Sequence, residues 1–186
     1  MNLQDIKVSI FNNLSSYESK PINLNTVLWW IKNDQSVAQK TELYRNLAMT
    51  ITRKEANKKV KDAMMPAFSV AVLLNGVGRQ TTHVTRVTGL SICDIDHVVS
   101  EKVKVNSEKF ATAMNTMFQK IIADPHTVLA YRTISGEGFR VIFCYEDEQG
   151  MPPENGILYR AAYRKGNQYY AELCGVAYDG QCGDLQ

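Results

Sequence analysis

The sequence has no long apolar run and is poor in the residues that usually bind structural metals. No stretch of about 18 apolar residues occurs, so we expect no transmembrane helix and no membrane partner. The first residues lack a basic start followed by an apolar core, so we expect no secretory signal. The four cysteines and three histidines among 186 residues form no C-x-x-C pair and no zinc-ligand spacing. These absences predict a reduced, cytoplasmic protein without a structural metal.

The composition is that of an ordinary globular domain, with 45% hydrophobic and 22% charged residues. This excludes collagen-like and wholly disordered chains. The net charge of +2 is too small to indicate nucleic-acid binding by itself. Positive charge is nevertheless concentrated in residues 40–62. This segment is either a solvated helix face or a phosphate-facing surface, and the second interpretation involves Arg53, Lys54, Lys58, Lys59 and Lys61.

The spacing of apolar residues changes at Pro66. Before it, the pattern predicts a strand over 6–11, a helix capped by Asn25, a helix over 37–49 and a basic helix over 52–64. After it, the pattern predicts strands over 68–74, 81–87 and 89–94, a helix over 106–123, strands over 127–132 and 139–145, and a helix over 157–174. The apolar stripe of the helix over 106–123 is expected to lie in the core.

The short loop between the strands over 127–132 and 139–145 implies an antiparallel hairpin. We therefore predict an α+β fold with a largely antiparallel mixed sheet. The chain is expected to be a single domain over 1–186, with a mainly helical part over 1–64 and an α+β core over 65–186. We also expect it to be a fragment of a longer protein.

Asp94-x-Asp96 is the first candidate for chemistry. Residues i and i+2 of a strand point to the same face, so the two carboxylates are expected to lie side by side at a strand end. Carboxylates placed in this way repel each other unless a cation lies between them, and Mg²⁺ and Mn²⁺ prefer such oxygen ligands. A pair of solvated acids is the alternative. An EF-hand loop is excluded because Val99 and Val105 occupy its glycine and glutamate positions.

The acidic motif also agrees with the D-x-D-x-[T/V] pattern of haloacid-dehalogenase phosphatases, since Val98 follows at the right distance. That fold needs alternating strands and helices, which the predicted hairpin does not suit. A phosphatase therefore remains a third possibility for the function.

Ser135-Gly136-Glu137-Gly138-Phe139-Arg140 is the second candidate. Glycines let backbone N–H groups approach a phosphate, and Arg140 adds a fixed charge. The segment is neither a Walker A loop nor a dinucleotide fingerprint, and a plain hairpin turn is the alternative. Asp179 ends a short apolar run and is the third candidate, with Asp184 as its competitor. His97 and His126 are interpreted as packed or exposed side chains without a catalytic role.

Together these segments resemble the VirE N-terminal domain family, which comprises primase-like domains near the start of mobile-element replication proteins. That family in turn resembles the archaeo-eukaryotic primase, or primase-polymerase, superfamily with its RRM-like core. The resemblance implies that Asp94, Asp96 and Asp179 bind divalent metal. It implies that Ser135, with Gly136 and Gly138, contacts a nucleoside triphosphate. Arg140 stands where the superfamily has a histidine.

The resemblance implies Mg²⁺- or Mn²⁺-dependent nucleotidyl transfer on single-stranded DNA during mobile-element replication, with a helicase region downstream in the same protein. The basic helix would track the template strand. Arginine binds a triphosphate well but does not titrate near neutral pH. The resemblance therefore predicts nucleotide binding more strongly than it predicts catalysis. A non-catalytic nucleotide- or single-stranded-DNA-binding module is therefore the alternative function.

Overall fold

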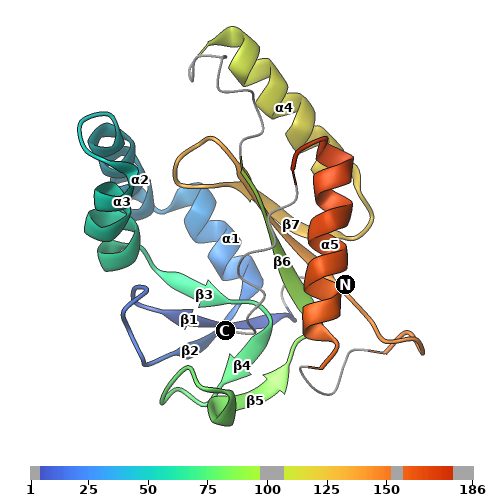
Figure 1. Ribbon diagram of the computed structural model, residues 1–186. Coiled ribbons are helices and arrows are strands. Elements are labelled where there is room, and N and C mark those ends of the chain that lie inside the picture. The colour runs from blue at the N-terminus through green and yellow to red at the C-terminus, as the bar shows by residue number, and fades with distance from the viewer. Residues whose placement is uncertain (1–4, 97–106, 152–156, 178–186) are drawn as a thin grey trace. The chain divides into compact units, whose positions relative to one another are not determined.

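The computed structural model describes residues 5–96, 107–151 and 157–177, and it has the mixed α+β architecture that the sequence predicts (Figure 1). The chain forms two compact units, residues 1–88 and 89–185. The predicted division between residues 64 and 65 lies inside the first unit, and the single domain over 1–186 stays a prediction. Among the described residues, no helix has the length and apolar character needed to cross a membrane.

The first unit contains two small antiparallel sheets. Strands β1 (Lys7–Phe11), β2 (Lys20–Asn23) and β3 (Ala67–Ser69) pair in the order β2-β1-β3. Strands β4 (Val72–Leu74) and β5 (Val84–Val87) form the second sheet. Because β2 lies at an edge, it tolerates Pro21, which has no N–H to donate to a neighbouring strand. The buried Ser9 hydroxyl accepts a 2.9 Å hydrogen bond from the Leu74 amide and so links the two sheets.

Helices complete the first unit. Helix α1 spans Leu24–Asn33, α2 spans Gln35–Ala48 and α3 spans Arg53–Ala56, and a π-helical segment, η1 (Asn57–Asp62), continues α3. Thr52 and Glu55 form a capping box at the start of α3, which satisfies amide groups that have no partner inside the helix. Ala56 and Val60, four residues apart, are buried, and the basic residues between them face solvent.

The second unit is built on a three-stranded antiparallel sheet with helices on one face. Strands β6 (Leu90–Ile95), β7 (Thr127–Arg132) and β8 (Phe139–Cys144) pair in the order β6-β8-β7. Helices α4 (Glu108–Ala123) and α5 (Tyr159–Cys174) lie on the same side of this sheet (Figure 1). The short loop between β7 and β8 forms the predicted antiparallel hairpin.

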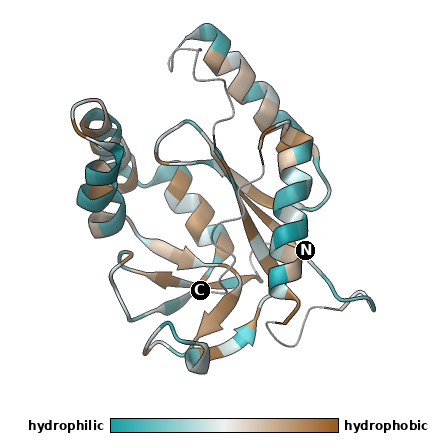
Figure 2. Cartoon of the chain, in the orientation of Figure 1, coloured by the Kyte–Doolittle hydropathy of each residue, from teal (hydrophilic) through white to brown (hydrophobic). Residues whose placement is uncertain are grey.

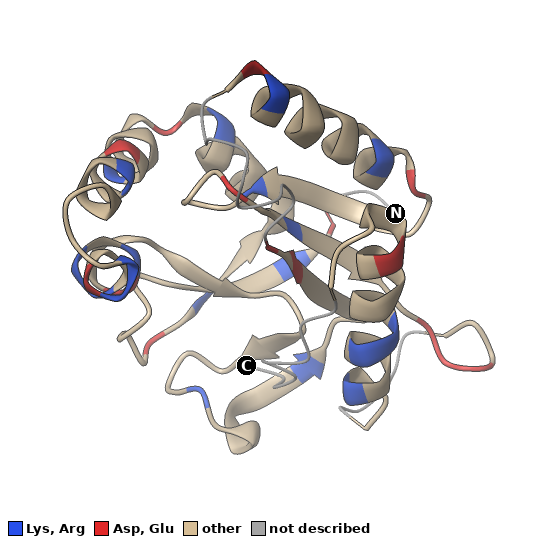
Figure 3. Ribbon diagram, turned by 45° about the horizontal axis from the view of Figure 1, so that its top comes forward, with Lys and Arg blue, Asp and Glu red and all other residues tan. Residues whose placement is uncertain are grey.

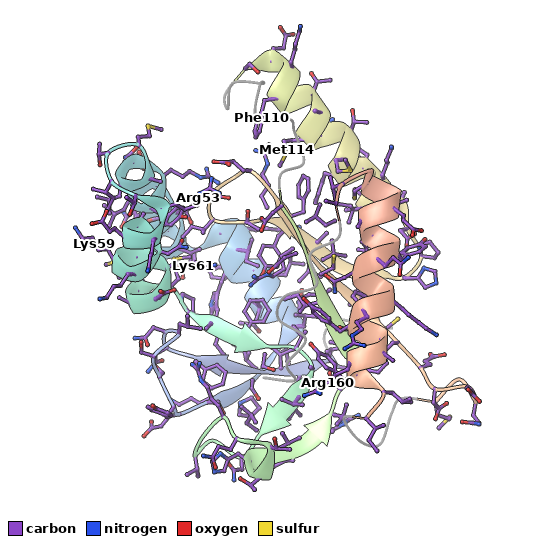
Figure 4. The ribbon with its side chains drawn as sticks, in the orientation of Figure 1. Arg53, Lys59, Lys61, Phe110, Met114 and Arg160 are labelled. Atoms are coloured by element: carbon purple, nitrogen blue, oxygen red, sulfur yellow. The ribbon has the colours of Figure 1, made fainter. Side chains whose placement is uncertain are left out.

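Alternating residues of the sheet form the core of the second unit. From the strands, Cys93, Ile95, Phe139, Val141 and Phe143 belong to one buried cluster. The predicted stripe of α4 supplies Phe110, Met114 and Ile121 to the same cluster. Figure 2 shows apolar positions along this helix, and Figure 4 labels Phe110 and Met114. Burying one such large side chain contributes about 1.5–3 kcal/mol. Because strand residues alternate, the side chains of Asp94 and Arg140 lie on the opposite face of the sheet.

Three local predictions are wrong. Asn25 does not cap α1, which begins at Leu24 after Asn23. Residues 68–74 do not form one strand, because the chain breaks at Val70 and Ala71 and the two halves join different sheets. Both residues are buried, so the apolar pattern is continuous across the break and conceals it. Residues 81–83 form a 3₁₀ turn, η2 (Thr81–His83), rather than the start of a strand, and β2 was not predicted.

Candidate functional site

The strand register of the second unit brings Asp94 and Arg140 together. In the β6-β8 pair Asp94 lies opposite Arg140, and in the β7-β8 pair Tyr131 lies opposite Arg140. Side chains that lie opposite each other in antiparallel strands have Cβ atoms about 4.5–5.5 Å apart. An acid, a base and a phenol therefore form one row across the sheet, on the face away from α4 and α5.

Arg140 binds Asp94 in a bidentate ion pair. Its Nε donates to Asp94 Oδ1 at 2.6 Å, and an Nη donates to Asp94 Oδ2 at 2.7 Å. The side chains keep 31% (Arg140) and 43% (Asp94) of their surface exposed, so solvent still reaches the pair. Burial alone would lower the pKa of Arg140, but Tyr131 and Asp94 beside it raise that pKa above the ordinary arginine value. The guanidinium therefore stays charged at every physiological pH.

Asp96 follows directly after β6 and is exposed. Gly138 lies against it from the β7-β8 loop. A Cβ atom on Gly138 would lie 2.4 Å from the Ile95 carbonyl oxygen and 2.8 Å from Asp96 Oδ1. The glycine is therefore required for close packing between the loop and the strand end that carries the acidic motif. The structure brings four of the predicted site residues, Asp94, Asp96, Gly138 and Arg140, to one end of the sheet.

The loop before Gly138 uses its polar groups internally. Gly136 has a positive φ of 76° and its amide donates to the Thr133 carbonyl at 2.9 Å. The Ser135 hydroxyl lies 3.1 Å from the Thr133 hydroxyl and accepts from the Glu137 amide at 3.3 Å. These contacts are those of an ordered hairpin turn. A phosphate bound here by Ser135 or the Gly136 amide would have to replace them.

The donor set for a divalent cation consists of two carboxylates in the described part of the chain. Asp94 and Asp96 offer the oxygen ligands that Mg²⁺ and Mn²⁺ prefer. Among the described residues, no group of three or more potential metal ligands occurs. Asp179 and its competitor Asp184, the predicted third ligand, lie outside the described residues, as does His97.

The predicted nucleic-acid-binding residues belong to the first unit. Arg53 and Lys54 lie on α3, and Lys58, Lys59 and Lys61 lie on η1. All five side chains are exposed. Figure 3 shows positive charge along this continuous helix, and Figure 4 labels Arg53, Lys59 and Lys61 on it. The segment therefore presents several cations to solvent, as a backbone-tracking surface requires.

Sequence reasoning missed a hydrogen-bonded cluster at the start of β7. The Asp124 side chain, only 5% exposed, accepts from the Tyr169 hydroxyl, from the His126 amide at 2.9 Å and from His126 Nδ1 at 3.1 Å. Burial raises the pKa of Asp124, but these hydrogen bonds outweigh it and lower that pKa. In the sequence, Asp124-Pro125 predicts the end of the preceding helix, and Asp124 to Thr127 contribute to the family resemblance, but the D-x-H spacing alone does not predict this cluster. The contact with Tyr169 joins residues 45 apart and has no sequence signal.

His126 and Tyr169 also line a groove of about 380 Å³ in the second unit. Its other walls come from the end of β8, the loop that follows and α5. Gly166 lies in this wall against Phe143, where a Cβ atom would lie 2.0 Å from the ring. Of the predicted candidate residues for catalysis or binding, none lines this groove.

The comparisons with known proteins identify a family without naming an activity. The family model described as BT4734-like, N-terminal domain matches residues 59–186, which is more than half of the chain. No curated protein and no solved structure matches the chain. The prediction that the chain is a VirE N-terminal domain is wrong, because the matching model is the BT4734-like one. The wider relationship to primases receives no support from these comparisons.

Proposed function

The chain belongs to the BT4734-like, N-terminal domain family, a name that states no activity, and we propose that it binds a nucleoside triphosphate with Mg²⁺ or Mn²⁺ for nucleotidyl transfer on single-stranded DNA. The observation that carries the proposal is the bidentate Asp94–Arg140 pair beside Asp96 at one end of the second unit's sheet. Here anionic and cationic side chains meet at a solvent-accessible strand end. Such a combination suits a metal-bound phosphate ligand, which carries charges of both signs.

Asp94 and Asp96 are the residues that would hold the divalent cation. A cation held there would supply positive charge that offsets the negative charge developing on a transferred phosphoryl group. The two carboxylates would fix the position of the cation, because Asp94 lies within β6 and Gly138 packs against Ile95 and Asp96. Positioning of this kind is the main contribution of a protein to phosphoryl transfer.

Arg140 would hold the triphosphate. Its guanidinium presents planar, paired N–H donors that match phosphate oxygens as well as they match the Asp94 carboxylate. Ligand binding would then exchange partners, with phosphate replacing the carboxylate on Arg140 while the carboxylate becomes available to the cation. This exchange leaves no buried charge without a partner, so its free-energy cost stays small.

The basic helix would bind the template strand. Exposed lysines and arginines bind phosphates without sequence preference, and such binding weakens with salt. We place this activity in the cytoplasm, since the described cysteines, Cys93, Cys144 and Cys174, are free thiols. A downstream helicase region is implied by the family resemblance alone.

A non-catalytic nucleotide- or single-stranded-DNA-binding module is the second candidate. One observation favours it: both oxygens of Asp94 already accept from Arg140, and the described residues supply only Asp96 as a further carboxylate. A site with these two carboxylates can bind a phosphate through Arg140 and still hold too little divalent metal for nucleotidyl transfer. No contact among the described residues favours the phosphatase interpretation.

Calorimetric titration separates these candidates. Mn²⁺ with a nucleoside triphosphate is titrated into the wild-type chain, into Asp94→Asn/Asp96→Asn and into Glu42→Gln, which removes an exposed carboxylate from α2. The proposal predicts binding by the wild type and by the control and loss of binding in the double variant. Circular dichroism confirms that each variant is folded. Nucleotide binding that ignores both the metal and the acids would favour the non-catalytic module, and no nucleotide binding by the folded wild type would refute both.

A further inference from the structure

The first unit contains a half-buried arginine without an anionic partner. Arg79 packs its guanidinium 4.0 Å from the centre of the Phe11 ring, and an Nη donates to the Asn13 carbonyl at 3.2 Å. No carboxylate of the described residues forms an ion pair with it. The Nε–H is buried and has no acceptor. Burial accordingly lowers the pKa of Arg79.

A second orphaned polar group lies next to the loop that carries Arg79. Ser19 is 6% exposed, and its hydroxyl has no hydrogen-bond partner. Its backbone joins this loop, because the Ser19 amide donates to the Gly76 carbonyl at 3.3 Å. Gly76 has a positive φ of 91°, and a Cβ atom there would lie 3.3 Å from the Ser19 carbonyl oxygen. The two loops are therefore held closely together by backbone contacts at Ser19 and Gly76.

Leaving such groups unsatisfied is costly. A buried donor or acceptor without a partner costs about 1–3 kcal/mol, and a buried charge without a partner costs more. Unsatisfied groups in a native fold therefore require an explanation, and a ligand that supplies the missing partners is one. An anion with several acceptor oxygens is a ligand of this kind, because the Arg79 Nε–H and the Ser19 hydroxyl are both potential donors without an acceptor.

We propose that Arg79 and Ser19 form a phosphate-binding site in the first unit, between the loop over 12–19 and the loop over 75–80. Phe11 holds the guanidinium plane in place from below, so little side-chain freedom is lost when a phosphate binds. The site uses neither Asp94 nor Arg140, and only the choice of a DNA strand as its occupant rests on the proposed template-binding role of η1.

The surroundings favour the phosphate of a single-stranded nucleic acid over free phosphate. The Tyr17 side chain is 75% exposed and Leu14 is 49% exposed, both on the loop that faces Arg79. An exposed aromatic ring is a stacking platform for a base. The Leu14 amide donates to the Asp62 carbonyl at 3.2 Å, which anchors this loop at the end of the basic segment η1. A strand bound along η1 would thus continue toward Arg79 within the same unit.

The first test observes the arginine directly in the full chain. The Nε–H resonance of Arg79 is identified in a ¹⁵N-labelled sample by its loss in Arg79→Lys, which keeps the charge. Inorganic phosphate and a mixed-sequence single-stranded DNA oligonucleotide are then titrated separately. A shift with both ligands supports a site for the phosphate group itself, and a shift with the oligonucleotide alone supports a site for the strand backbone. No shift with either ligand overturns the proposal.

The second test uses matched variants. Arg79→Gln should weaken oligonucleotide binding about tenfold, the expected loss for one charge-assisted contact. Arg86→Gln removes the same charge from an exposed position of β5 and should leave the affinity nearly unchanged. Equal losses in the two variants would show that only net charge matters and would reject the site.

Ser19→Ala distinguishes a ligand contact from a structural one. Removing a hydroxyl that has no partner in the free protein should leave the unfolding midpoint unchanged or raise it, while phosphate or oligonucleotide binding weakens. Tyr17→Ala adds a further distinction, since it should weaken oligonucleotide binding but not inorganic phosphate binding. A Ser19→Ala variant that loses stability and keeps full affinity would show that the hydroxyl is part of the fold and not of a binding site.

Discussion

Gly138 shows how one missing side chain positions the acidic motif. The loop approaches the end of β6 so closely that a methyl group at residue 138 would overlap the Ile95 carbonyl and the Asp96 carboxylate. Gly138→Ala should therefore destabilise the chain by about 1–3 kcal/mol, the usual cost of overpacking. It should also displace Asp96 and so weaken cation binding.

Urea unfolding of Gly138→Ala and of Gly150→Ala checks this expectation. Gly150 has a positive φ of 74°, unlike Gly138, and the nearest atom to its Cβ position is 3.7 Å away. The control therefore carries backbone strain without a steric overlap, whereas Gly138→Ala introduces the overlap without that strain. A Gly138→Ala variant as stable as the wild type would mean that the close approach does not limit the substitution.

The Asp124 cluster predicts a specific pH dependence. Because hydrogen bonds from Tyr169 and His126 lower the pKa of Asp124 in the folded chain, the ionised carboxylate contributes stability above the ordinary aspartate pKa of about 3.9. That contribution is lost as the pH falls through the lowered pKa. Asp124→Asn should therefore be less stable than the wild type at pH 7, and the difference should shrink toward zero in acid.

Unfolding midpoints in urea between pH 7 and pH 3 measure this difference. Tyr169→Phe, which removes one donor, should lose part of the same stability with the same pH profile. Tyr17→Phe removes an exposed phenol elsewhere and should show no such profile. A difference between wild type and Asp124→Asn that stays constant with pH would assign the effect to packing rather than to the carboxylate charge.

The acidic motif and the Gly-Arg motif could both be found in the sequence, but their pairing could not. The D-x-D spacing and the glycines are local features. The contact of Asp94 with Arg140 spans 46 residues and depends on the register between β6 and β8, because a shift by one residue would place the two side chains on opposite faces. The orphaned Ser19 hydroxyl and Arg79 Nε–H likewise belong to two loops far apart in the sequence, whose contact has no local signal.

The capping box is the feature of the basic helix that its sequence specifies most directly. The Thr52 hydroxyl accepts from the Glu55 amide at 3.3 Å, and the Thr52 amide donates to Glu55 Oε2 at 3.1 Å. Thr52→Ala should cost about 1 kcal/mol, as loss of an N-cap usually does, and should fray the segment that carries the lysines. Chemical denaturation measures the cost.

Thr116→Ala is the matched control for this change. Thr116 lies exposed in the interior of α4 and makes no cap, and alanine is the better helix former there. The control should therefore be neutral or slightly stabilising. Equal destabilisation in both variants would show that the capping box does not set the stability of the basic helix.

Elements with a strong apolar period were predicted well. The helix over 106–123 and the strands over 127–132 and 139–145 match α4, β7 and β8 to within two residues, because their buried residues recur at the spacing of the element. The apolar run over 68–74 predicts one strand where the structure has two. Its residues stay buried at the point where the chain leaves one sheet and joins another. There the Ala71 carbonyl accepts from the Thr88 amide, next to the Val72–Val87 pair of β4 and β5, so the chain has passed from pairing with β1 to pairing with β5.

For the molecule as a whole, the distribution of charge matters more than the net charge of +2. The chain forms two compact units, and the exposed lysines of η1 lie together on one short segment of the first. Opposite charges elsewhere cancel them in the total but not locally, because screening in physiological salt limits charge effects to about 8 Å. Composition alone could not show this concentration. The helical spacing of the buried Ala56 and Val60 could, because it places the basic residues between them on the solvent side of the helix.

This concentration predicts how DNA binding responds to salt. Each phosphate neutralised on a single strand contributes about 0.7 to the slope of log affinity against log salt. Replacing Lys58, Lys59 and Lys61 by Gln should therefore reduce the slope by about 2, with a similar loss for every oligonucleotide sequence. The control replaces Lys32, Lys109 and Lys120, which are exposed on other helices, and should leave the slope unchanged. Fluorescence anisotropy at several salt concentrations measures both slopes. A slope that falls equally in the two triple variants would mean that DNA responds to total charge, because only a defined contact surface makes the position of the lysines matter.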